Sequence, residues 1–435
     1  MAIKRYDKFK DSGVKWLGKI PEGWGIEKGK WLFNEEDRPV RVDDEIVTCF
    51  RDGQVTLRRL RKTEGFTNSL KEIGYQGIRK GDLVIHNMDA FAGAIGIAEE
   101  DGKSTPVYSV CTQRIADTLH LKYYSYFLRN LALRGFILSL AKGIRERSTD
   151  FRFSDLGVLE LPKPTFAEQQ AISEFLDDKT AKIDQLIAIK EKEINLLKER
   201  RQILIQKAVT KGLDPTVKLK NSGVDWIGEI PEHWEVTSVK KLLKIPITDG
   251  PHTTPQLYDE GIPFISAEAI KNNKIDFSKK RGYISITDHK EFTKKYKPKK
   301  NDIYMVKSGA TTGNIAMVET DEEFSIWSPL AVFRTNNNRL DARFLFFALQ
   351  SVYFKKGVEL KWSYGTQQNI GMGVLSNLPV IYTSLDEQQT IVEYLERIDS
   401  KIAQAIFLKQ QEIEKLKEYK TVLIDNVVTG KVRVD

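Results

Sequence analysis

The stretch EQQAISEFLDDKTAKIDQLIAIKEKEINLLKERRQILIQKAVT, residues 168–210, decides the fold, because a second copy follows at 387–429 as EQQTIVEYLERIDSKIAQAIFLKQQEIEKLKEYKTVLIDNVVT. Twenty of the 43 aligned positions are identical. Neither copy contains Gly or Pro, and strong helix formers dominate both. The two copies therefore predict two long helices of one design, each roughly 60 Å long at about 1.5 Å per residue.

Both copies carry the same heptad repeat of apolar residues. The expected helix-pair core consists of Ile183, Ile187, Ile194, Leu197 and Leu204 in the first copy and Ile402, Ile406, Ile413, Leu416 and Leu423 in the second. Basic residues interrupt this core at matching places, at Lys190 and Arg201 and again at Lys409 and Lys420. Two interpretations stay open: a polar residue that fixes the register of the pair, or a stutter at which the side chain reaches out to water. Because each apolar stripe needs a partner, we expect the two helices to pack on each other.

Composition limits the class of protein. A chain of 435 residues predicts two to four domains. The net charge of +8 favours a polyanionic partner without requiring one. Two cysteines, Cys49 and Cys111, indicate a reducing compartment. We see neither the apolar stretch of a signal peptide nor a run long enough to cross a membrane, and we expect a cytoplasmic protein. The histidines lack metal-ligand spacing, so no metal site is expected.

A second repeat opens each half of the chain. Residues 11–24, DSGVKWLGKIPEGW, match residues 221–234, NSGVDWIGEIPEHW, at nine of 14 positions. Each half then continues with a short apolar strand, a glycine-bearing loop, a second strand, a helix-like stretch and a closing Leu-Pro. The sequence predicts an α+β protein with an internal pseudo-twofold repeat. Its expected parts are a globular domain at 1–165, a long helix at 166–214, a second globular domain at 215–385 and a second long helix at 386–435.

The tryptophans of the opening motif recur with it, as Trp16 and Trp24 in the first half and Trp226 and Trp234 in the second. Base stacking is one possible use of such rings. Because they belong to the repeated scaffold, we expect them instead to pack against the base of each helix.

Catalytic signatures are missing from the sequence. It has no G-x-x-x-x-G-K-[ST] loop, no strand-bound G-x-G-x-x-G, no amino-methyltransferase tetrad and no G-x-S-x-G elbow. Glu359-Leu360-Lys361 matches the end of a nuclease motif, but no carboxylate in a suitable context precedes it. We expect a chain that is not an enzyme.

These features resemble the specificity (S) subunits of type I restriction-modification systems. The resemblance rests on S-G-V-x-W-[LI]-G-x-I-P-E-x-W at the start of each half and on Leu-Pro followed by Glu-Gln-Gln and the helix. In the second half it adds DGPHTTPQLYDEGIPFISAEAI (249–270), IDFSKKRGYIS (275–285), VKSGATTGNIAMVE (306–319) and WSPLAVFR (327–334). The first half departs from it at FRDGQVTLRRLRKTEGF (50–66), which lacks the DG-x-H-x-T-P pattern.

The resemblance implies two globular target recognition domains separated by two long antiparallel coiled-coil helices. Each domain would read one half of a bipartite, asymmetric double-stranded DNA site, about one helical turn apart, and the helices would set the gap. They would also dock two modification (methyltransferase) subunits, which two restriction (translocase/endonuclease) subunits would join. S-adenosylmethionine, ATP and Mg are expected on those partners and no cofactor in this chain.

Candidate DNA contacts follow from base-readout chemistry, in which Arg binds guanine and Asn or Gln binds adenine. In the first domain they are Arg51, Arg58, Arg59, Arg61, Lys62, His86, Asn87, Arg145 and Arg147. In the second they are His252, Thr253, Thr254, Lys307, Ser308, Thr311, Tyr364, Thr366, Gln367 and Gln368. A solvated surface role for each arginine, a plain turn at Gly309 and Gly313 and an exposed turn histidine at His252 remain open.

Two other functions stay possible from the residues. A free-standing DNA-binding protein with a coiled-coil spacer would bind its site without a partner, although the chain has no helix-turn-helix or zinc pattern. An autonomous nuclease or methyltransferase would need motifs that the sequence does not contain.

Overall fold

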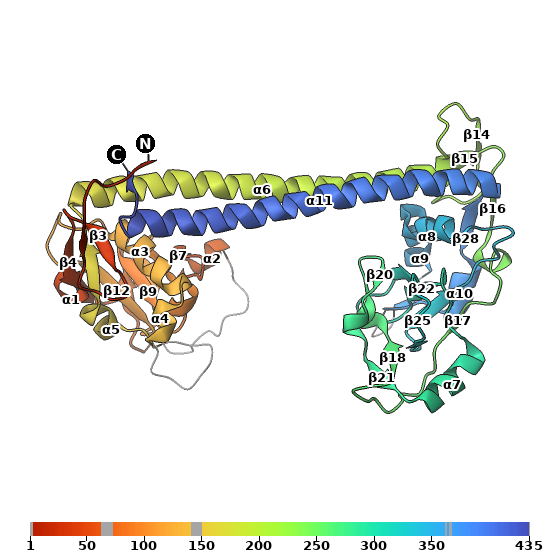
Figure 1. Ribbon diagram of the computed structural model, residues 1–435, viewed down its shortest axis with the longest axis horizontal. Helices are drawn as coiled ribbons and strands as arrows, with labels where there is room; N and C mark the ends of the chain where they lie inside the picture. Colours follow the sequence, from red (N-terminus) through yellow and green to blue (C-terminus); the bar gives the residue numbers. More distant parts are fainter. Residues whose placement is uncertain (1–2, 62–72, 141–149, 362, 365–367, 435) are drawn as a thin grey trace. The chain divides into compact units, whose positions relative to one another are not determined.

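The computed structural model describes residues 3–61, 73–140, 150–361, 363–364 and 368–434 (Figure 1). The chain divides into two compact units, which we call unit 1 (Met1–Lys190 with Gln410–Asp435) and unit 2 (Glu191–Lys409). Two long helices dominate: α6 covers Phe166–Lys211 and α11 covers Leu385–Val428. These helices confirm the two long helices that the repeat predicts. Each unit contains one part of each of them.

Unit 1 is built on a four-stranded antiparallel sheet with the strand order β10-β9-β12-β5. Two-stranded pairs surround it, formed by β1 with β29, β2 with β3, β4 with β13, β6 with β7 and β8 with β11. The strands are β1 Ile3–Lys4, β2 Phe9–Asp11, β3 Lys19–Pro21, β4 Gly25–Lys28, β5 Phe33–Glu36, β6 Val47–Cys49, β7 Val55–Leu57, β8 Gln76–Ile78, β9 Leu83–His86, β10 Ile95–Ile97, β11 Gly102–Ser104, β12 Tyr108–Gln113, β13 Glu160–Lys163 and β29 Arg433–Val434. The shorter helices are α1 Gly29–Leu32, α2 Arg58–Arg61, η1 Ala90–Ala92, α3 Leu121–Leu133, α4 Phe136–Ser139 and α5 Phe153–Val158.

Unit 2 repeats this plan with the strand order β23-β22-β25-β17. The pairs β14-β15 and β16-β28 correspond to β2-β3 and β4-β13 of unit 1. Unit 2 also contains the three-stranded sheet β21-β18-β24 and the pairs β19-β20 and β26-β27. The strands are β14 Leu219–Asn221, β15 Glu229–Pro231, β16 Glu235–Ser238, β17 Thr248–Asp249, β18 Ile262–Ile265, β19 Ile270–Lys271, β20 Lys274–Ile275, β21 Gly282–Ile284, β22 Ile303–Val306, β23 Ile315–Met317, β24 Ser325–Ile326, β25 Leu330–Phe333, β26 Ser363–Tyr364, β27 Gln368–Asn369 and β28 Pro379–Tyr382. The shorter helices are η2 Val239–Lys241, η3 Ala267–Ala269, η4 Phe277–Lys279, α7 Ile286–Lys295, α8 Ala342–Gln350, α9 Val352–Leu360 and α10 Met372–Asn377.

In each unit the structure forms two consecutive helices where the sequence predicts one helix-like stretch: α3 and α4 in unit 1, and α8 and α9 in unit 2. In unit 1 the chain leaves α3 and turns at Gly135, whose φ of 80° is a left-handed conformation that glycine adopts readily. In unit 2 the break is at Ser351, an extended residue whose hydroxyl accepts a hydrogen bond from the backbone amide of Phe354 at the start of α9.

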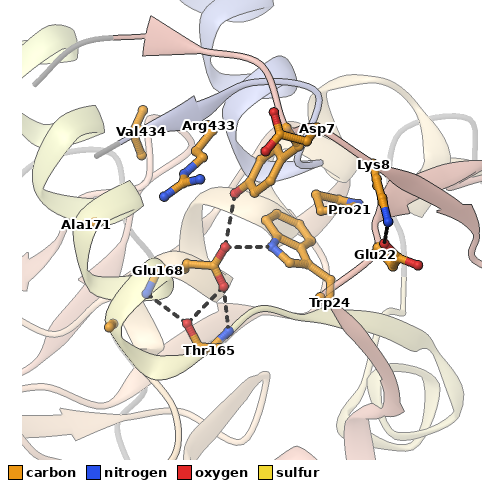
Figure 2. Close-up of a pocket in the computed structure, with 13 residues that line it drawn as sticks. Asp7, Lys8, Pro21, Glu22, Trp24, Thr165, Glu168, Ala171, Arg433 and Val434 are labelled. Carbon is orange, nitrogen blue, oxygen red and sulfur yellow. Dashed lines mark hydrogen bonds and ion pairs between the residues drawn. The ribbon is translucent and has the colours of Figure 1, made fainter.

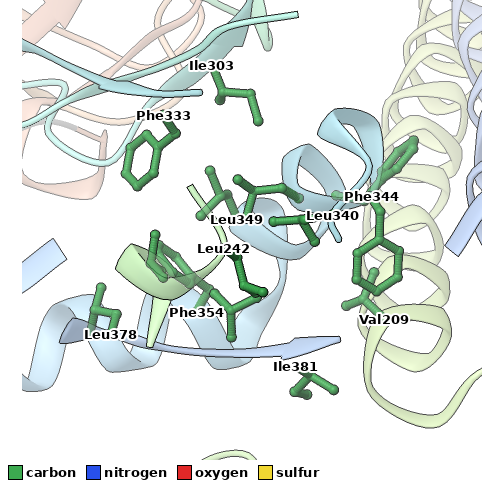
Figure 3. Close-up of a cluster of buried hydrophobic side chains, with 14 of the residues drawn as sticks. Val209, Leu242, Ile303, Phe333, Leu340, Phe344, Leu349, Phe354, Leu378 and Ile381 are labelled. Atoms are coloured by element: carbon green, nitrogen blue, oxygen red, sulfur yellow. The ribbon is translucent and has the colours of Figure 1, made fainter. Parts of the chain in front are cut away.

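The core of each unit joins the sheet to the long helices. In unit 2, one buried cluster includes Val209 of α6, Phe344 of α8 and Phe333 of β25 (Figure 3). Ile391 of α11 belongs to the same cluster. Such burial contributes about 25 cal/mol for each Å² of apolar surface removed from water. The long helices are therefore part of both folded cores.

Within unit 1, α6 and α11 run antiparallel, as two ion pairs between them show. The Lys420 Nζ lies 2.6 Å from an Asp184 carboxylate oxygen, and the Lys190 Nζ lies 2.9 Å from the Glu412 carboxylate. The expected core residues of this part, Ile183, Ile187, Ile413, Leu416 and Leu423, are buried or half-buried.

Unit 2 holds the matching arrangement. The Lys409 Nζ lies 2.7 Å from Glu193, and an Arg201 guanidinium nitrogen lies 2.5 Å from Asp399. The expected core residues here, Ile194, Leu197, Leu204, Ile402 and Ile406, are likewise buried or half-buried. All four basic residues at core positions thus pair with a carboxylate on the other helix, which favours the register-fixing interpretation over a stutter.

Trp24 of the opening motif lies against the first turn of α6 in unit 1 (Figure 2). The buried Trp24 donates its indole N–H to the Glu168 carboxylate at 3.2 Å, and Tyr6 donates its hydroxyl to the same carboxylate at 3.3 Å. In unit 2, Trp234 donates to Glu387 at 3.0 Å. The packing role predicted for these two tryptophans is confirmed.

Candidate nucleic-acid interface

In unit 2, three loops meet where strand β22 ends. The Lys307 amide donates to the Pro329 carbonyl at 2.8 Å, and the Ile370 amide donates to the Lys307 carbonyl at 2.8 Å. Ser308 forms a bridge with Asn369 in the β26–β27 hairpin. The glycine loop, the Trp-Ser-Pro loop and this hairpin therefore share one edge of the sheet.

A fourth loop, residues 250–254, joins the same edge. The Ser328 amide donates to the Pro251 carbonyl at 3.2 Å. A Cβ on Gly250 would lie 2.0 Å from the Ile326 carbonyl oxygen, so only glycine allows this close approach. The loop displays His252, Thr253 and Thr254, all exposed. Thr311 of the glycine loop is also exposed, whereas Ser308 is half-buried.

A buried carboxylate lies beneath these loops. The Asp249 side chain is fully buried, and its Oδ1 accepts a hydrogen bond from the Lys295 Nζ at 2.6 Å. Its Oδ2 lies 3.3 Å from the Lys307 Nζ and 3.2 Å from the His252 Nε2. Burial alone would raise the pKa of Asp249, but the two lysines outweigh it and lower the pKa below its ordinary value.

Unit 1 builds the same edge with different side chains. The Asn87 amide donates to the Val107 carbonyl at 2.9 Å, and the Phe151 amide donates to the Asn87 carbonyl at 3.2 Å. These are the contacts that Lys307 makes in unit 2, so Asn87 and Lys307 occupy equivalent positions.

Asn87 directly follows strand β9, and its side chain is buried. Its side chain is only 6% exposed, and its amide oxygen accepts a hydrogen bond from Ser109 at 3.1 Å. This buried amide supports the loop through its hydrogen bond with Ser109, and its contact with a base stays a prediction. The neighbouring His86 is half-buried beside Tyr108, and burial lowers its pKa below the ordinary histidine value.

Four of the arginines predicted to contact DNA in unit 1 lie on the β6–β7 turn and on α2, each beside an acceptor. Arg51 pairs with Asp89 at 2.8 Å and Arg59 with Glu45 at 2.6 Å. Arg61 pairs with Asp52 and lies over the Phe50 ring, and the Arg58 Nε donates to Thr48 at 3.1 Å. These pairs hold the guanidinium groups in place at the surface, where exposed ion pairs contribute little stability.

Several predicted residues lie outside the described part of the chain. They are Lys62, Arg145, Arg147, Thr366 and Gln367. For Tyr364 and Gln368 only the backbone is described, in β26 and β27.

Sequence reasoning missed Asp249 and Lys295. Asp249 directly precedes the Gly-Pro-His triplet, which is the signal that could have drawn attention to it. Lys295 belongs to residues 271–300, which contain eleven Lys and Arg but three Asp and Glu. Such a basic segment is typical of a surface that contacts phosphates.

The described residues contain no group of three or more His, Cys, Asp or Glu side chains that could hold a metal ion. In the same residues, no helix is long and apolar enough to cross a membrane. The edge described above offers cations, hydroxyls and amides on backbone-fixed loops, a set suited to binding a polyanion.

Comparison with known proteins now adds the family. Residues 231–418 match the type I restriction modification DNA specificity domain. The type I restriction enzyme MjaVIII specificity subunit of Methanocaldococcus jannaschii is 28% identical over 431 residues, which cover 96% of this chain and 94% of that one. The putative MjaX specificity subunit of the same organism is 26% identical, with 96% of each chain covered. The EcoBI specificity subunit of Escherichia coli is 27% identical over 55% of this chain and 51% of that one.

Solved structures share the fold. A chain from work on complex assembly and conformational transition of the type I R-M system aligns with a TM-score of 0.66 at 15% identity, covering 94% of this chain and 98% of that chain. The HsdS subunit from Thermoanaerobacter tengcongensis aligns with a TM-score of 0.53 at 16% identity, covering 95% and 98%. By its repeated fold and by these relatives, the chain is similar to the specificity subunits of type I restriction-modification systems, and residues 231–418 match the DNA specificity domain of that family.

Proposed function

We propose that unit 1 and unit 2 each read one half of a bipartite, asymmetric site on double-stranded DNA. One observation carries this proposal: the loop edge at Asn87 and the loop edge at Lys307 share their backbone hydrogen bonds but carry different side chains. A common scaffold with two different surfaces is what a protein needs to recognise two different short sequences.

A map of modified bases tests this proposal. DNA from cells that express this chain with its modification subunit should carry N6-methyladenine in both halves of a split motif. Exchanging the segment between β16 and β28 for that of another specificity subunit should change one half of the motif only. A map that stays the same after the exchange would overturn the proposal, and site-specific binding by the isolated chain would favour a free-standing DNA-binding protein.

We also propose that the paired helices set the gap between the half-sites. The ion pairs between α6 and α11 favour one alignment of the two helices along each other. A spacer of defined length requires such a fixed alignment. Four residues inserted after Lys190 and four after Lys409 would add about one helical turn. The methylated motif should then keep both halves and gain a wider gap, whereas an unchanged gap would contradict the spacer role.

Exposed apolar residues on the helices support docking of two modification subunits. In unit 1 these are Leu186, Ile189, Tyr419 and Val422, and in unit 2 they are Leu196, Ile203, Phe407 and Leu408. Ile189 and Val422 occupy heptad position c in unit 1, and the repeat places Leu408 and Ile203 at the same positions in unit 2. Apolar side chains that recur on a solvent-facing side are typical of a protein interface.

Paired charge substitutions test the docking surfaces. Ile189→Lys with Val422→Lys should remove one modification subunit from the purified complex, and Leu408→Lys with Ile203→Lys should remove the other. Gln185→Lys and Gln404→Lys are matched controls, because both glutamines are exposed and occupy one heptad position in the two copies. Native mass spectrometry would count the subunits, and an unchanged count in both pairs of variants would refute these surfaces.

The remaining partners and cofactors follow from the same assembly. Two restriction subunits would join the modification subunits, and S-adenosylmethionine, ATP and Mg would be bound by those partners in the cytoplasm. The two cysteines of this chain are buried and unpaired, which fits a reducing compartment.

A further inference from the structure

The Asp249 cluster in unit 2 combines a buried carboxylate with more exposed basic side chains. Asp249 ends strand β17, where its backbone pairs with Ala331 of β25, and Gly250 fixes the chain that follows. The three basic side chains come from different places: Lys295 from the end of α7, Lys307 from the end of β22 and His252 from the 250–254 loop. Their long side chains reach one buried carboxylate.

Exposure increases from the carboxylate outwards. The Asp249 side chain is 0% exposed, Lys307 is 13% exposed, Lys295 is 51% exposed and His252 is 71% exposed. An ammonium group has three N–H donors, and one contact to Asp249 leaves others for a ligand. The cluster has one carboxylate and two lysines, so a positive charge remains to attract an anion.

One oxygen of Asp249 is not fully satisfied. Among the described residues, its Oδ2 makes no hydrogen bond of good geometry, although Lys307 and His252 lie at ion-pair distance. A buried, charged acceptor in this state draws nearby donors towards itself. It therefore restricts where the Lys307 and His252 nitrogens lie.

The residue equivalent to Lys307 in unit 1 is uncharged. Asn87 stands where Lys307 stands, and its side chain is tied to Ser109. The common scaffold therefore does not require the charged cluster, and its chemistry serves something particular to unit 2.

We propose that Asp249 is a positioning residue that aims Lys307, Lys295 and His252 at a backbone phosphate of the DNA half-site bound by unit 2. This inference rests on the proposed function. A compact ammonium held in one place suits a phosphate, because a phosphate contact needs charge and position rather than a pattern of donors and acceptors. The contact fixes the register in which unit 2 lies on the DNA.

The effect of Asp249→Asn distinguishes positioning from simple charge. Removing a negative charge beside DNA would by itself tighten binding. If Asp249 instead aims the lysines, the same substitution weakens binding, by about tenfold for one well-placed charged contact. The two explanations thus predict changes of opposite sign.

The experiment is a double-mutant cycle on the complex with the modification subunits, using a duplex that carries the methylated motif and a scrambled duplex. Lys307→Gln should weaken motif binding and lower the slope of log K against log salt by about 0.9 for one lost phosphate contact. Asp249→Asn should weaken binding similarly in the wild-type background and by a smaller factor in the Lys307→Gln background, where only Lys295 and His252 remain for Asp249 to position.

Asp302→Asn is the matched control. Asp302 is also buried, but it lies at the opposite end of β22 and pairs with Arg334. This variant should lower thermal stability and leave the motif affinity of the folded complex unchanged. Tighter binding by Asp249→Asn, or unchanged affinity with only lower stability, would overturn the inference, as would equal effects of Asp249→Asn in both backgrounds. A wild-type complex that binds both duplexes equally would instead refute the proposed function.

Discussion

Asn87 and Lys307 show how one scaffold carries two surfaces. The backbone amide of each residue donates to a carbonyl of a neighbouring loop, that of Val107 for Asn87 and that of Pro329 for Lys307. The backbone carbonyl of each accepts from a second loop, from the amide of Phe151 for Asn87 and from that of Ile370 for Lys307. In unit 1 the side chain is a buried amide held by Ser109, and in unit 2 it is a lysine paired with a buried aspartate. Backbone hydrogen bonds hold the edge together in both, so side chains there can differ without loss of the fold. The predictions below test how far this equivalence extends.

The largest effect is expected from giving unit 1 the cation of unit 2. Asn87→Lys would bury a charge without the carboxylate that Lys307 has, which should destabilise unit 1 by about 3–5 kcal/mol. Hydrogen exchange should show lost protection in β9 and β12 and unchanged protection in β22. Met88→Lys, at a neighbouring exposed position, should change stability by less than about 0.5 kcal/mol. Full protection of the β9 amides in Asn87→Lys would show that position 87 tolerates a buried lysine as well as position 307 does.

The next effect concerns a feature that the two units share. Trp24→Phe and Trp234→Phe each remove an N–H donor to a helix-base carboxylate, Glu168 or Glu387. Each should lower the free energy of unfolding in urea by about 1.5–3 kcal/mol, the usual contribution of a hydrogen bond to a charged group. Trp31→Phe, at an exposed ring, is the control. A large loss in one unit only would mean that the repeat is not energetically symmetric.

Acid should affect unit 2 through Glu387. Burial raises the pKa of this carboxyl, but hydrogen bonds from Thr383, His233 and Trp234 outweigh it and leave the pKa below its ordinary value. A lowered pKa in the folded state gives stability that is present above the ordinary glutamate pKa of about 4.3 and is lost as the pH falls through the folded value. Urea unfolding from pH 7 to pH 3 should therefore show wild type losing more stability than Glu387→Gln. Parallel curves would contradict this assignment.

The smallest effect is expected from the repeat-related ion pairs of the helices. Double-mutant cycles on Lys190 with Glu412 and on Lys409 with Glu193 should each give a coupling of about 0.2–1 kcal/mol, because both pairs are partly exposed. The two values should agree, since the repeat places the same residue types at similar distances, 2.9 Å and 2.7 Å. A coupling found in one pair alone would show that the internal symmetry of the helices is incomplete.

The scaffold was predictable because its signals are long and repeated. Two copies of a 43-residue heptad pattern specify the helices and their core positions, and the tryptophans of the opening motif indicate their own packing. The basic core residues left two interpretations open, because a heptad pattern does not show what lies opposite Lys190. Only the pairing with Glu412 decides between them.

The binding edge was harder to predict because it depends on contacts between distant residues. Asp249, Lys295 and Lys307 are far apart in sequence and meet only when β17, α7 and β22 are in place. Asn87 directly follows an apolar strand, and the sequence does not show that folding leaves its side chain only 6% exposed. The individual contacts to bases and phosphates remain predictions.

The strand pair β1–β29 bears on the order in which this chain folds during synthesis. Ile3 pairs with Val434, and Tyr123 donates its hydroxyl to the Val428 carbonyl at 2.9 Å. Unit 1 therefore needs residues 410–434 to complete its core, whereas unit 2 is complete once Lys409 has emerged from the ribosome. At about 5–20 residues per second, the first 190 residues wait on the order of ten to fifty seconds for the remainder of their core. Unit 2 can therefore finish folding before unit 1, which reverses the usual amino-to-carboxyl order of domain folding.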